Sequence, residues 1–116
     1  VVEDEETNYL LLQEILDKMK IRFTHVSRGE DAVIACNKNP EYFDMVLMDI
    51  KLPGMDGVTA TKHIKEENPS LPVIAQTAYA LKNEIVQYSR IFDDYLTNPL
   101  MPKDVNKVVE KYLVRN

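Results

Sequence analysis

The chain has little of what would mark several classes of protein. Its 116 residues include one cysteine, Cys36, and no tryptophan. A single cysteine excludes an internal disulfide and fits a reducing compartment. No apolar run approaches the roughly 20 residues that cross a bilayer, and no signal peptide is visible. The sequence therefore predicts a domain that folds around its own core, without disulfides and without a membrane span.

Basic residues are also in deficit, because 14 Lys and Arg stand against 19 Asp and Glu, for a net charge of −5. This balance argues against binding of nucleic acid by the domain. Hydrophobic residues make up 45% of the chain, which is enough to bury one core. We expect residues 1–116 to form one domain. Because the chain starts inside an apolar stub without a methionine, we expect it to be an N-terminally truncated part of a longer protein.

Short apolar runs alternate with amphipathic stretches along the chain. Runs rich in β-branched and aromatic residues predict strands at 1–2, 21–26, 43–48, 71–75 and 95–97. Apolar side chains at helical spacing predict a helix from Thr7, one after a capping box of Ser27 and Glu30, two over 57–67 and 80–90, and one from Pro102.

This alternation predicts a parallel sheet that helices cover on both faces. The fold class is α/β, a flavodoxin-like doubly wound sheet of five strands in the order 2-1-3-4-5, with five helices. In that order the first and third strands are neighbours. Their ends carry Glu3, Asp4 and Asp49, so these carboxylates should converge at one edge of the sheet. Convergence of like charge in one cleft favours a bound cation.

Four segments resemble the receiver domains of two-component signalling systems, of the chemotaxis-regulator type. They are VVEDE at 1–5, LMDIKLPGMDG at 47–57, IAQTA at 74–78 and DYLTNPL at 94–100. Each falls at a predicted strand end, and together they extend over the whole chain. The run IAQTAYA, followed by DDYLT, looks like receivers attached to hybrid sensor histidine kinases.

The resemblance implies a phosphoryl-transfer site. Asp49 is the expected phosphoacceptor, and Glu3 and Asp4 are the expected acidic pair that binds Mg²⁺. The backbone carbonyl of Lys51 is expected to bind the same ion. Mg²⁺ suits a site of carboxylates, a carbonyl and water, and it offsets the repulsion among the carboxylates. The family catalyses its own phosphorylation from a phosphohistidine and, slowly, its own dephosphorylation, and the sequence predicts no further enzyme activity.

Two residues are expected to report the phosphoryl group. Thr77 occupies the family's hydroxyl switch position, and Tyr95 its aromatic switch position. Simpler interpretations stay open, because Thr77 also fits an N-cap and Tyr95 a half-buried strand aromatic. Acidic residues at 5–6 suit a helix N-terminus, and Asp56 suits a helix N-cap.

The chain departs from the family at Asn98, where the resemblance calls for a lysine that pairs with the phosphoryl oxygens. An amide donates hydrogen bonds but brings no charge. Loss of the charge-assisted bond should cost about 1.5–3 kcal/mol of phospho-state stabilisation. The alternatives are a receiver with weakened coupling, a receiver with a rearranged cation, and a pseudo-receiver that acts by binding alone.

The resemblance also implies partners and a location. A histidine kinase or a histidine phosphotransfer domain is the expected phosphoryl donor, and the parent protein is expected to be a hybrid histidine kinase. The domain is expected in the cytoplasm, bound neither to nucleic acid nor to a membrane. The surface of the fourth helix, fifth strand and fifth helix is where an output contact or a homodimer is expected.

Two other functions fit the sequence less well. A flavodoxin-like electron carrier needs a Ser/Thr/Gly-rich phosphate loop after the first strand and aromatic rings around a flavin. This chain has acidic residues there and no tryptophan. A phosphatase of the aspartyl-nucleophile kind needs a second aspartate two positions after the first, and that position is Lys51. His25 and His63 lie far apart and predict no metal site.

Overall fold

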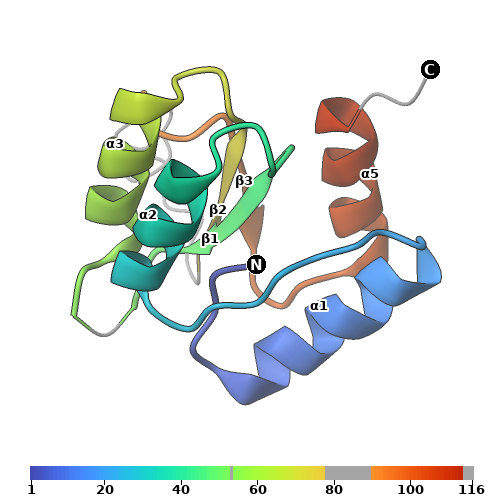
Figure 1. The fold of residues 1–116 in the computed structure, drawn as a ribbon. Helices are drawn as coiled ribbons and strands as arrows, with labels where there is room; N and C mark the ends of the chain where they lie inside the picture. The colour runs from blue at the N-terminus through green and yellow to red at the C-terminus, as the bar shows by residue number, and fades with distance from the viewer. Residues whose placement is uncertain (53, 78–89, 114–116) are drawn as a thin grey trace.

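Four described helices pack around a central parallel sheet (Figure 1). The computed structural model describes residues 1–52, 54–77 and 90–113. Its elements, in chain order, are α1 (Glu6–Lys18), α2 (Gly29–Lys38), β1 (Val46–Asp49), α3 (Gly57–Glu67), β2 (Val73–Thr77), β3 (Asp94–Thr97) and α5 (Pro102–Tyr112). None of the described helices is long and apolar enough to cross a membrane.

The sheet brings its strand ends to a common edge. β1 pairs with β2 and β2 with β3, all in parallel. Val2 adds isolated parallel bridges to Val26 on one side and to Met48 of β1 on the other. In the register of β1 and β2, Asp49 lies opposite Gln76. The predicted α/β architecture with a parallel sheet is confirmed.

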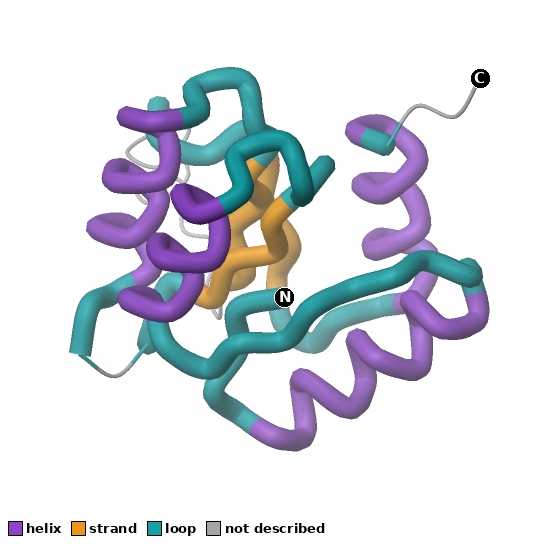
Figure 2. The backbone as a smooth tube through the Cα atoms, viewed as in Figure 1, coloured by secondary structure: helices purple, strands orange, loops and turns teal. Residues whose placement is uncertain are grey.

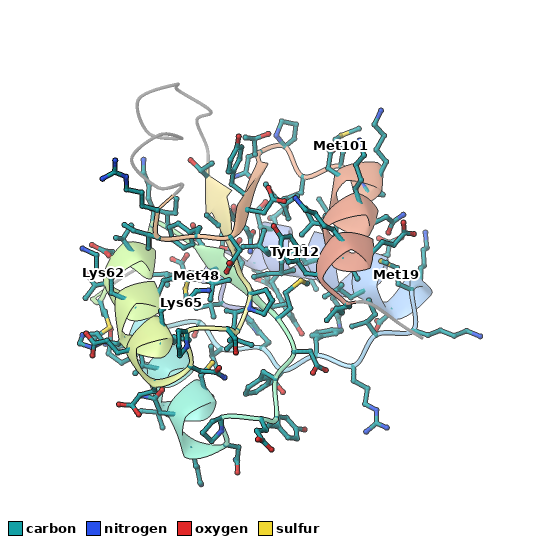
Figure 3. All side chains as sticks on the ribbon, turned by 90° about the horizontal axis from the view of Figure 1, so that it is seen from above. Met19, Met48, Lys62, Lys65, Met101 and Tyr112 are labelled. Carbon is teal, nitrogen blue, oxygen red and sulfur yellow. The ribbon has the colours of Figure 1, made fainter. Side chains whose placement is uncertain are left out.

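Helices cover both faces of the sheet. Figures 1 and 2 show α2 and α3 against one face and α1 and α5 against the other. Seen from above in Figure 3, Lys62 and Lys65 of α3 lie on one side of the strands, and Met101 lies at the start of α5 on the other. The first and last described helices thus form one layer, and α2 and α3 form the other.

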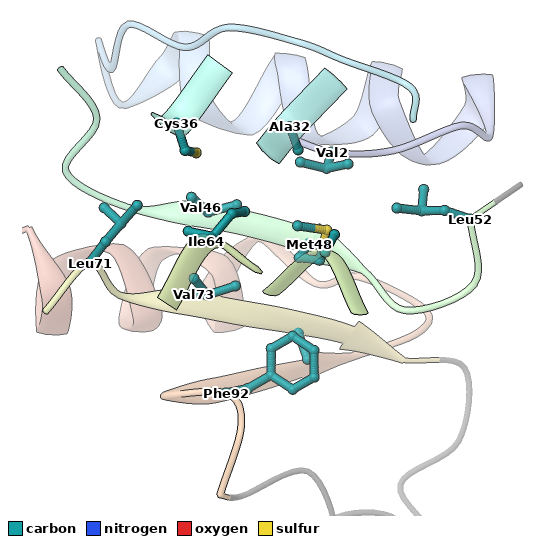
Figure 4. Packing of buried hydrophobic residues seen from close by; sticks show 12 residues of the cluster. Val2, Ala32, Cys36, Val46, Met48, Leu52, Ile64, Leu71, Val73 and Phe92 are labelled. Atoms are coloured by element: carbon teal, nitrogen blue, oxygen red, sulfur yellow. The ribbon is translucent and has the colours of Figure 1, made fainter. Parts of the chain in front are cut away.

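Each face of the sheet has its own hydrophobic cluster. Met48 and Val73 belong to the cluster under α2 and α3 (Figure 4), whereas their neighbours Leu47 and Ile74 belong to the cluster under α1 and α5. This division follows from the alternation of side chains along a strand. Because both faces are buried, the strands are nearly continuous apolar runs, as parallel sheets require.

Two helices begin where the sequence predicts, since their signals are local. The N-cap of α3 is Asp56, whose side chain accepts a hydrogen bond from Thr59 N at 2.8 Å. Pro102 opens α5. The helix predicted over 80–90 lies outside the described residues, apart from Arg90. The inward stripe of α5 is buried at Val105, Val108 and Val109.

The strands are shifted relative to the prediction. β1 begins at Val46 rather than at residue 43, and β2 covers 73–77 rather than 71–75. Pro72 has no N–H to donate, so the ladder of β2 begins after it, although its carbonyl accepts from Val46 N at 2.9 Å. The strand predicted over 21–26 contributes a single bridge at Val26. Its N–H donates to the Val1 carbonyl, and its carbonyl accepts from Glu3 N.

The predicted capping box of Ser27 and Glu30 is wrong. α2 begins at Gly29 with Arg28 as its N-cap residue, and no side chain caps it. The Glu30 carboxylate instead accepts from Met55 N at 2.7 Å, across 25 positions of sequence. A tertiary contact has therefore replaced the local one.

Candidate functional site

Three carboxylates meet at the carboxyl edge of the sheet. Oxygens of Glu3, Asp4 and Asp49 all lie within 4.8 Å of one another. Val2 directly precedes the first two; its N–H donates to Leu47 O at 2.8 Å, and its carbonyl accepts from Asp49 N at 3.0 Å. This pairing holds the acidic segment beside the end of β1. The predicted convergence of the acidic residues is confirmed.

The three carboxylates differ in their surroundings. Glu3 is only 1% exposed, whereas Asp49 is half-buried and Asp4 is exposed. Burial, together with a hydrogen bond to Asp49 and the charge of Asp49, raises the pKa of Glu3 to about 8. Burial also raises the pKa of Asp49. In the absence of a cation, the pair therefore holds a proton at neutral pH, and the more buried Glu3 is its main site.

Backbone N–H groups also face the carboxylates. Lys51 N donates to Asp49 Oδ1 at 3.1 Å, and Glu5 N donates to Glu3 Oε2 at 3.2 Å. Glu5 is the N-cap residue of α1, and Glu6 lies in the first turn, as expected for acidic residues at the positive end of a helix dipole. The bond from Glu5 N lowers the pKa of Glu3, but burial and Asp49 outweigh it.

The turn after Asp49 approaches the site closely. A Cβ at Gly57 would collide with the backbone carbonyl of Asp49, and Gly57 N donates to Ile50 O at 2.9 Å. Gly54 has a φ of 73°, in the left-handed region that glycine adopts without steric cost. These two glycines let the chain return tightly from β1 to α3.

This set of donors fits a small, hard cation. Carboxylate oxygens are the protein ligands that Mg²⁺ prefers, and Glu3, Asp4 and Asp49 each offer one to a common point. Burial and the nearby charge of Asp49 raise the pKa of Glu3, and a divalent ion would oppose both by favouring the ionised carboxylate. Lys51, whose carbonyl is predicted to join them, is tied to Asp49 by its own N–H.

Neighbouring strand ends bring two further predicted residues to the same edge. Thr77 ends β2, one position after Gln76, which lies opposite Asp49. Asn98 directly follows β3, and its N–H donates to Thr77 O at 3.0 Å. Tyr95 lies earlier in β3, and the residue is 37% exposed. The structure thus places Thr77 and Asn98 at this edge, and Tyr95 on the open side of β3.

Sequence reasoning missed two residues that support the site. The carbonyl of Glu3 lies 2.8 Å from His25 Nε2, which must be the donor because a carbonyl only accepts. The same imidazole stacks on Tyr9 with ring centroids 3.7 Å apart. Glu30 binds the loop after Asp49 through the bond described above. No local signal predicts these contacts, because they join residues 22 and 25 positions apart.

Gln76 is a third residue whose place beside the site was not predicted. It is 2% exposed, and neither atom of its side-chain amide has a hydrogen-bond partner. Ile74, two positions earlier, belongs to the cluster under α1 and α5, so alternation places Gln76 on that face. An unpartnered buried amide therefore lies beside Asp49 in the sheet register.

The chain belongs to the response regulator receiver domain family, whose pattern it matches over residues 1–110. Sensor protein GacS of Pseudomonas syringae pv. syringae is 41% identical over 119 aligned residues, which cover 96% of this chain and 13% of GacS. The autoinducer 1 sensor kinase/phosphatase LuxN of Vibrio harveyi is 28% identical over 116 residues, covering 100% of this chain and 13% of LuxN. The chain thus spans a small part of the length of these relatives.

Solved structures show the same fold. The receiver domain of a sensor histidine kinase from Pseudomonas aeruginosa has a TM-score of 0.87 at 29% identity, covering 98% of this chain and 94% of that one. In that protein a magnesium ion is coordinated in the active-site cleft. The signal receiver domain of a histidine kinase from Syntrophus aciditrophicus has a TM-score of 0.83 at 26% identity, covering 97% of this chain and 86% of that one.

Proposed function

We propose that this domain accepts a phosphoryl group from a phosphohistidine on Asp49, with Mg²⁺ bound beside it. The clustering of Glu3, Asp4 and Asp49 within 4.8 Å at the end of β1 carries the proposal. Family membership and the magnesium ion in the Pseudomonas aeruginosa receiver support it. These carboxylates and the Lys51 carbonyl would hold the ion. Bound Mg²⁺ neutralises charge on the carboxylates and on the incoming phosphoryl oxygens.

Asp49 supplies the nucleophile in the transfer. One of its carboxylate oxygens forms a bond to phosphorus while the N–P bond of the donor breaks, and the electron pair leaves with the imidazole nitrogen. Bound Mg²⁺ would favour the ionised form of Asp49, which would then carry the negative charge that the attack requires. Attack of water on the acyl phosphate then returns the carboxylate and inorganic phosphate.

Thr77 and Tyr95 are proposed to convert phosphorylation into a change of surface. The phosphoryl group adds about −1.5 to −2 charges and three acceptor oxygens. Thr77 lies at the strand end next to β1, where its hydroxyl can move to meet one of these oxygens, and the exposed Tyr95 can then turn inward. Asn98 adds no charge, so we propose that this coupling is weakened.

The wider setting is proposed from the same observations. The bridges from Val2 to Val26 and Met48 support the five-stranded order 2-1-3-4-5. Relatives such as GacS and LuxN, of which the chain spans 13%, support a hybrid sensor histidine kinase as the parent. A histidine kinase or phosphotransfer domain would then be the partner, in the cytoplasm. We propose a homodimer through the face of β3 and α5, where a groove of about 500 Å³ includes Tyr95 and Lys107.

Acetyl phosphate and Mg²⁺ test the proposed chemistry. Mass spectrometry should find one phosphoryl group on Asp49, and Asp49→Asn or chelation of the metal should abolish it. Asp93→Asn, at the opposite edge of the sheet, is the matched control and should label normally. A folded wild-type domain that does not label would favour a pseudo-receiver.

Asn98→Lys tests the proposed loss of coupling. The lysine should stabilise the phosphorylated state by about 1.5–3 kcal/mol, because an ammonium makes a charge-assisted bond to phosphoryl oxygens. NMR shifts of Thr77 and Tyr95 should then show a larger switched population at equal phosphorylation. Equal populations in the wild type and Asn98→Lys would show that Asn98 does not limit the switch.

A further inference from the structure

A contact outside the carboxylate cluster holds the loop that follows Asp49. Met55 N donates to Glu30 Oε1 at 2.7 Å. The Met55 carbonyl lies against Gly29, where an added Cβ would come within 2.6 Å of its oxygen. Gly29 and Glu30 are the first two residues of α2. The start of this helix therefore fixes both the N–H and the carbonyl of Met55.

Arg28 orients the Glu30 carboxylate. Arg28 Nε donates to Glu30 Oε2 at 3.0 Å, and Nη2 lies 2.8 Å from the same oxygen. This arrangement leaves Oε1 for Met55. The Met55 N–H and the Arg28 guanidinium hold the pKa of Glu30 below its usual range. The acceptor is therefore a carboxylate, and hydrogen bonds to ionised acceptors are stronger than neutral ones.

The other end of the same loop is tied to the site. Ile50 N donates to Gln76 O at 3.2 Å, and Lys51 N donates to Asp49 Oδ1 at 3.1 Å. Near Met55, the Gly54 backbone passes so close to Glu30 that an added Cβ would lie 3.1 Å from Oε1. Lys51 thus lies between an anchor at β1 and an anchor at α2.

We propose that Glu30 is a positioning residue for the metal site. It fixes the loop that carries the Lys51 carbonyl, without touching the ion or the phosphoryl group itself. The inference rests on the proposed Mg²⁺ binding and adds to it a residue from a different element. Outer contacts that orient metal ligands typically change metal affinity by 10- to 100-fold. Because Glu30 acts through one loop, the expected loss is about tenfold, at the lower end of that range.

Calorimetric titration of Mg²⁺ into the whole chain tests the proposal. Glu30→Ala should weaken binding about tenfold. Glu30→Gln keeps a side-chain oxygen that can accept from Met55 N, so it should restore most of the affinity. Amide hydrogen exchange provides a second measurement, because the Met55 N–H should exchange faster in Glu30→Ala and stay protected in Glu30→Gln.

Asp93→Asn is the control for a purely structural effect. Asp93 accepts from Lys65 Nζ at 2.6 Å and from Val73 N at 2.8 Å, so this variant also weakens an ion pair and a bond to the backbone. It should lower stability and leave Mg²⁺ affinity unchanged. Should Glu30→Ala fail to fold, Glu30→Asp keeps the charge and withdraws it from Met55, and it should also bind Mg²⁺ more weakly.

The outcomes separate this inference from the proposed function. Wild-type affinity in a folded Glu30→Ala or Glu30→Asp variant would overturn the positioning role and leave the proposed function intact. A wild-type domain that binds no Mg²⁺ would overturn both. Weaker binding in Glu30→Ala, rescue in Glu30→Gln and no change in Asp93→Asn would together establish it.

Discussion

Acidic side chains differ in their partners at the two edges of the sheet. At the carboxyl edge, Glu3, Asp4 and Asp49 face one another, and none of the ion pairs between described residues involves them. At the amino edge, Asp93 and Asp94 each have a basic partner. Among the described residues, the carboxylates at the end of β1 thus have no basic partner, whereas those at the start of β3 have one.

At the amino edge, hydrogen bonds and ion pairs engage both carboxylates. Asp93 Oδ2 accepts from Lys65 Nζ at 2.6 Å and from Val73 N at 2.8 Å, and so joins α3 to β2. Asp94 Oδ2 lies 3.4 Å from Lys111 Nζ of α5. These contacts join the two carboxylates to α3, β2 and α5. This edge therefore has a structural role.

The direction of the helices contributes to the difference. The helices run opposite to the strands, so the last turns of α3 and α5 bring Lys65 and Lys111 to the amino edge. The first turn of α1, with Glu6, begins at the carboxyl edge. Helix dipoles favour basic residues at the first edge and anions at the second. The comparison teaches that the carboxylates without a basic partner among the described residues are those of the proposed Mg²⁺ site.

The largest expected difference between the two edges is in how the free energy of unfolding depends on pH. Without divalent ions, the free energy of unfolding should fall as pH rises from about 4.5 to about 8, because the pKa of folded Glu3 is raised across that interval. The unfolded chain releases this proton first, so it binds fewer protons than the folded chain in the window. Urea unfolding measures the effect, and Glu3→Gln should flatten it. A rise in stability over the same window would contradict the raised pKa.

Mg²⁺ should stabilise the carboxyl edge at neutral pH. An ion that binds the folded chain alone at 100 times its Kd raises the free energy of unfolding by about 2.7 kcal/mol. Thermal unfolding with and without Mg²⁺ measures the shift. Asp93→Asn should keep the response, whereas Asp4→Asn should reduce it. An equal response in both variants would place the ion elsewhere.

Asp93→Ala should lower the free energy of unfolding by removing contacts at the amino edge. The change leaves Lys65 without its carboxylate partner and Val73 N without the side-chain oxygen that it contacts, at an expected cost of about 1–3 kcal/mol. Urea unfolding gives this loss, and Lys65→Ala should lower stability by less because Val73 N keeps its acceptor. Labelling of Asp49 should be unchanged in both variants. A stability equal to that of the wild type would show that the pair contributes nothing.

The smallest effect concerns a polar side chain beside Asp49. Gln76 is buried with no hydrogen-bond partner for its amide, so Gln76→Leu should raise the free energy of unfolding by about 1 kcal/mol. Thr61 of α3 is likewise buried and unpartnered, and Thr61→Val provides the same change away from the carboxylates. Chemical denaturation compares the two. A loss of stability in Gln76→Leu alone would show that its amide has a partner in solution.

Much of the fold could be predicted because its signals are local. Asp56 caps α3 and Pro102 opens α5 where the sequence indicates, since a cap and a first-turn proline act on their own helix. The acidic cluster was also predictable, because Asp49 ends a buried run and parallel strands share an edge. The capping box at Ser27 failed for the opposite reason. Its Glu30 found a stronger partner in a distant loop.

The sequence by itself determined the periodicity of the elements, the helix boundaries at Asp56 and Pro102, and the placement of carboxylates at strand ends. Tertiary structure alone decided which acidic side chains have partners. Asp93 meets Lys65 from 28 positions away, whereas Glu3 meets Asp49 and acquires a raised pKa through burial. The charge and burial around a side chain depend on residues that are distant in the sequence. No local pattern therefore distinguishes a carboxylate that has a basic partner from one that has none.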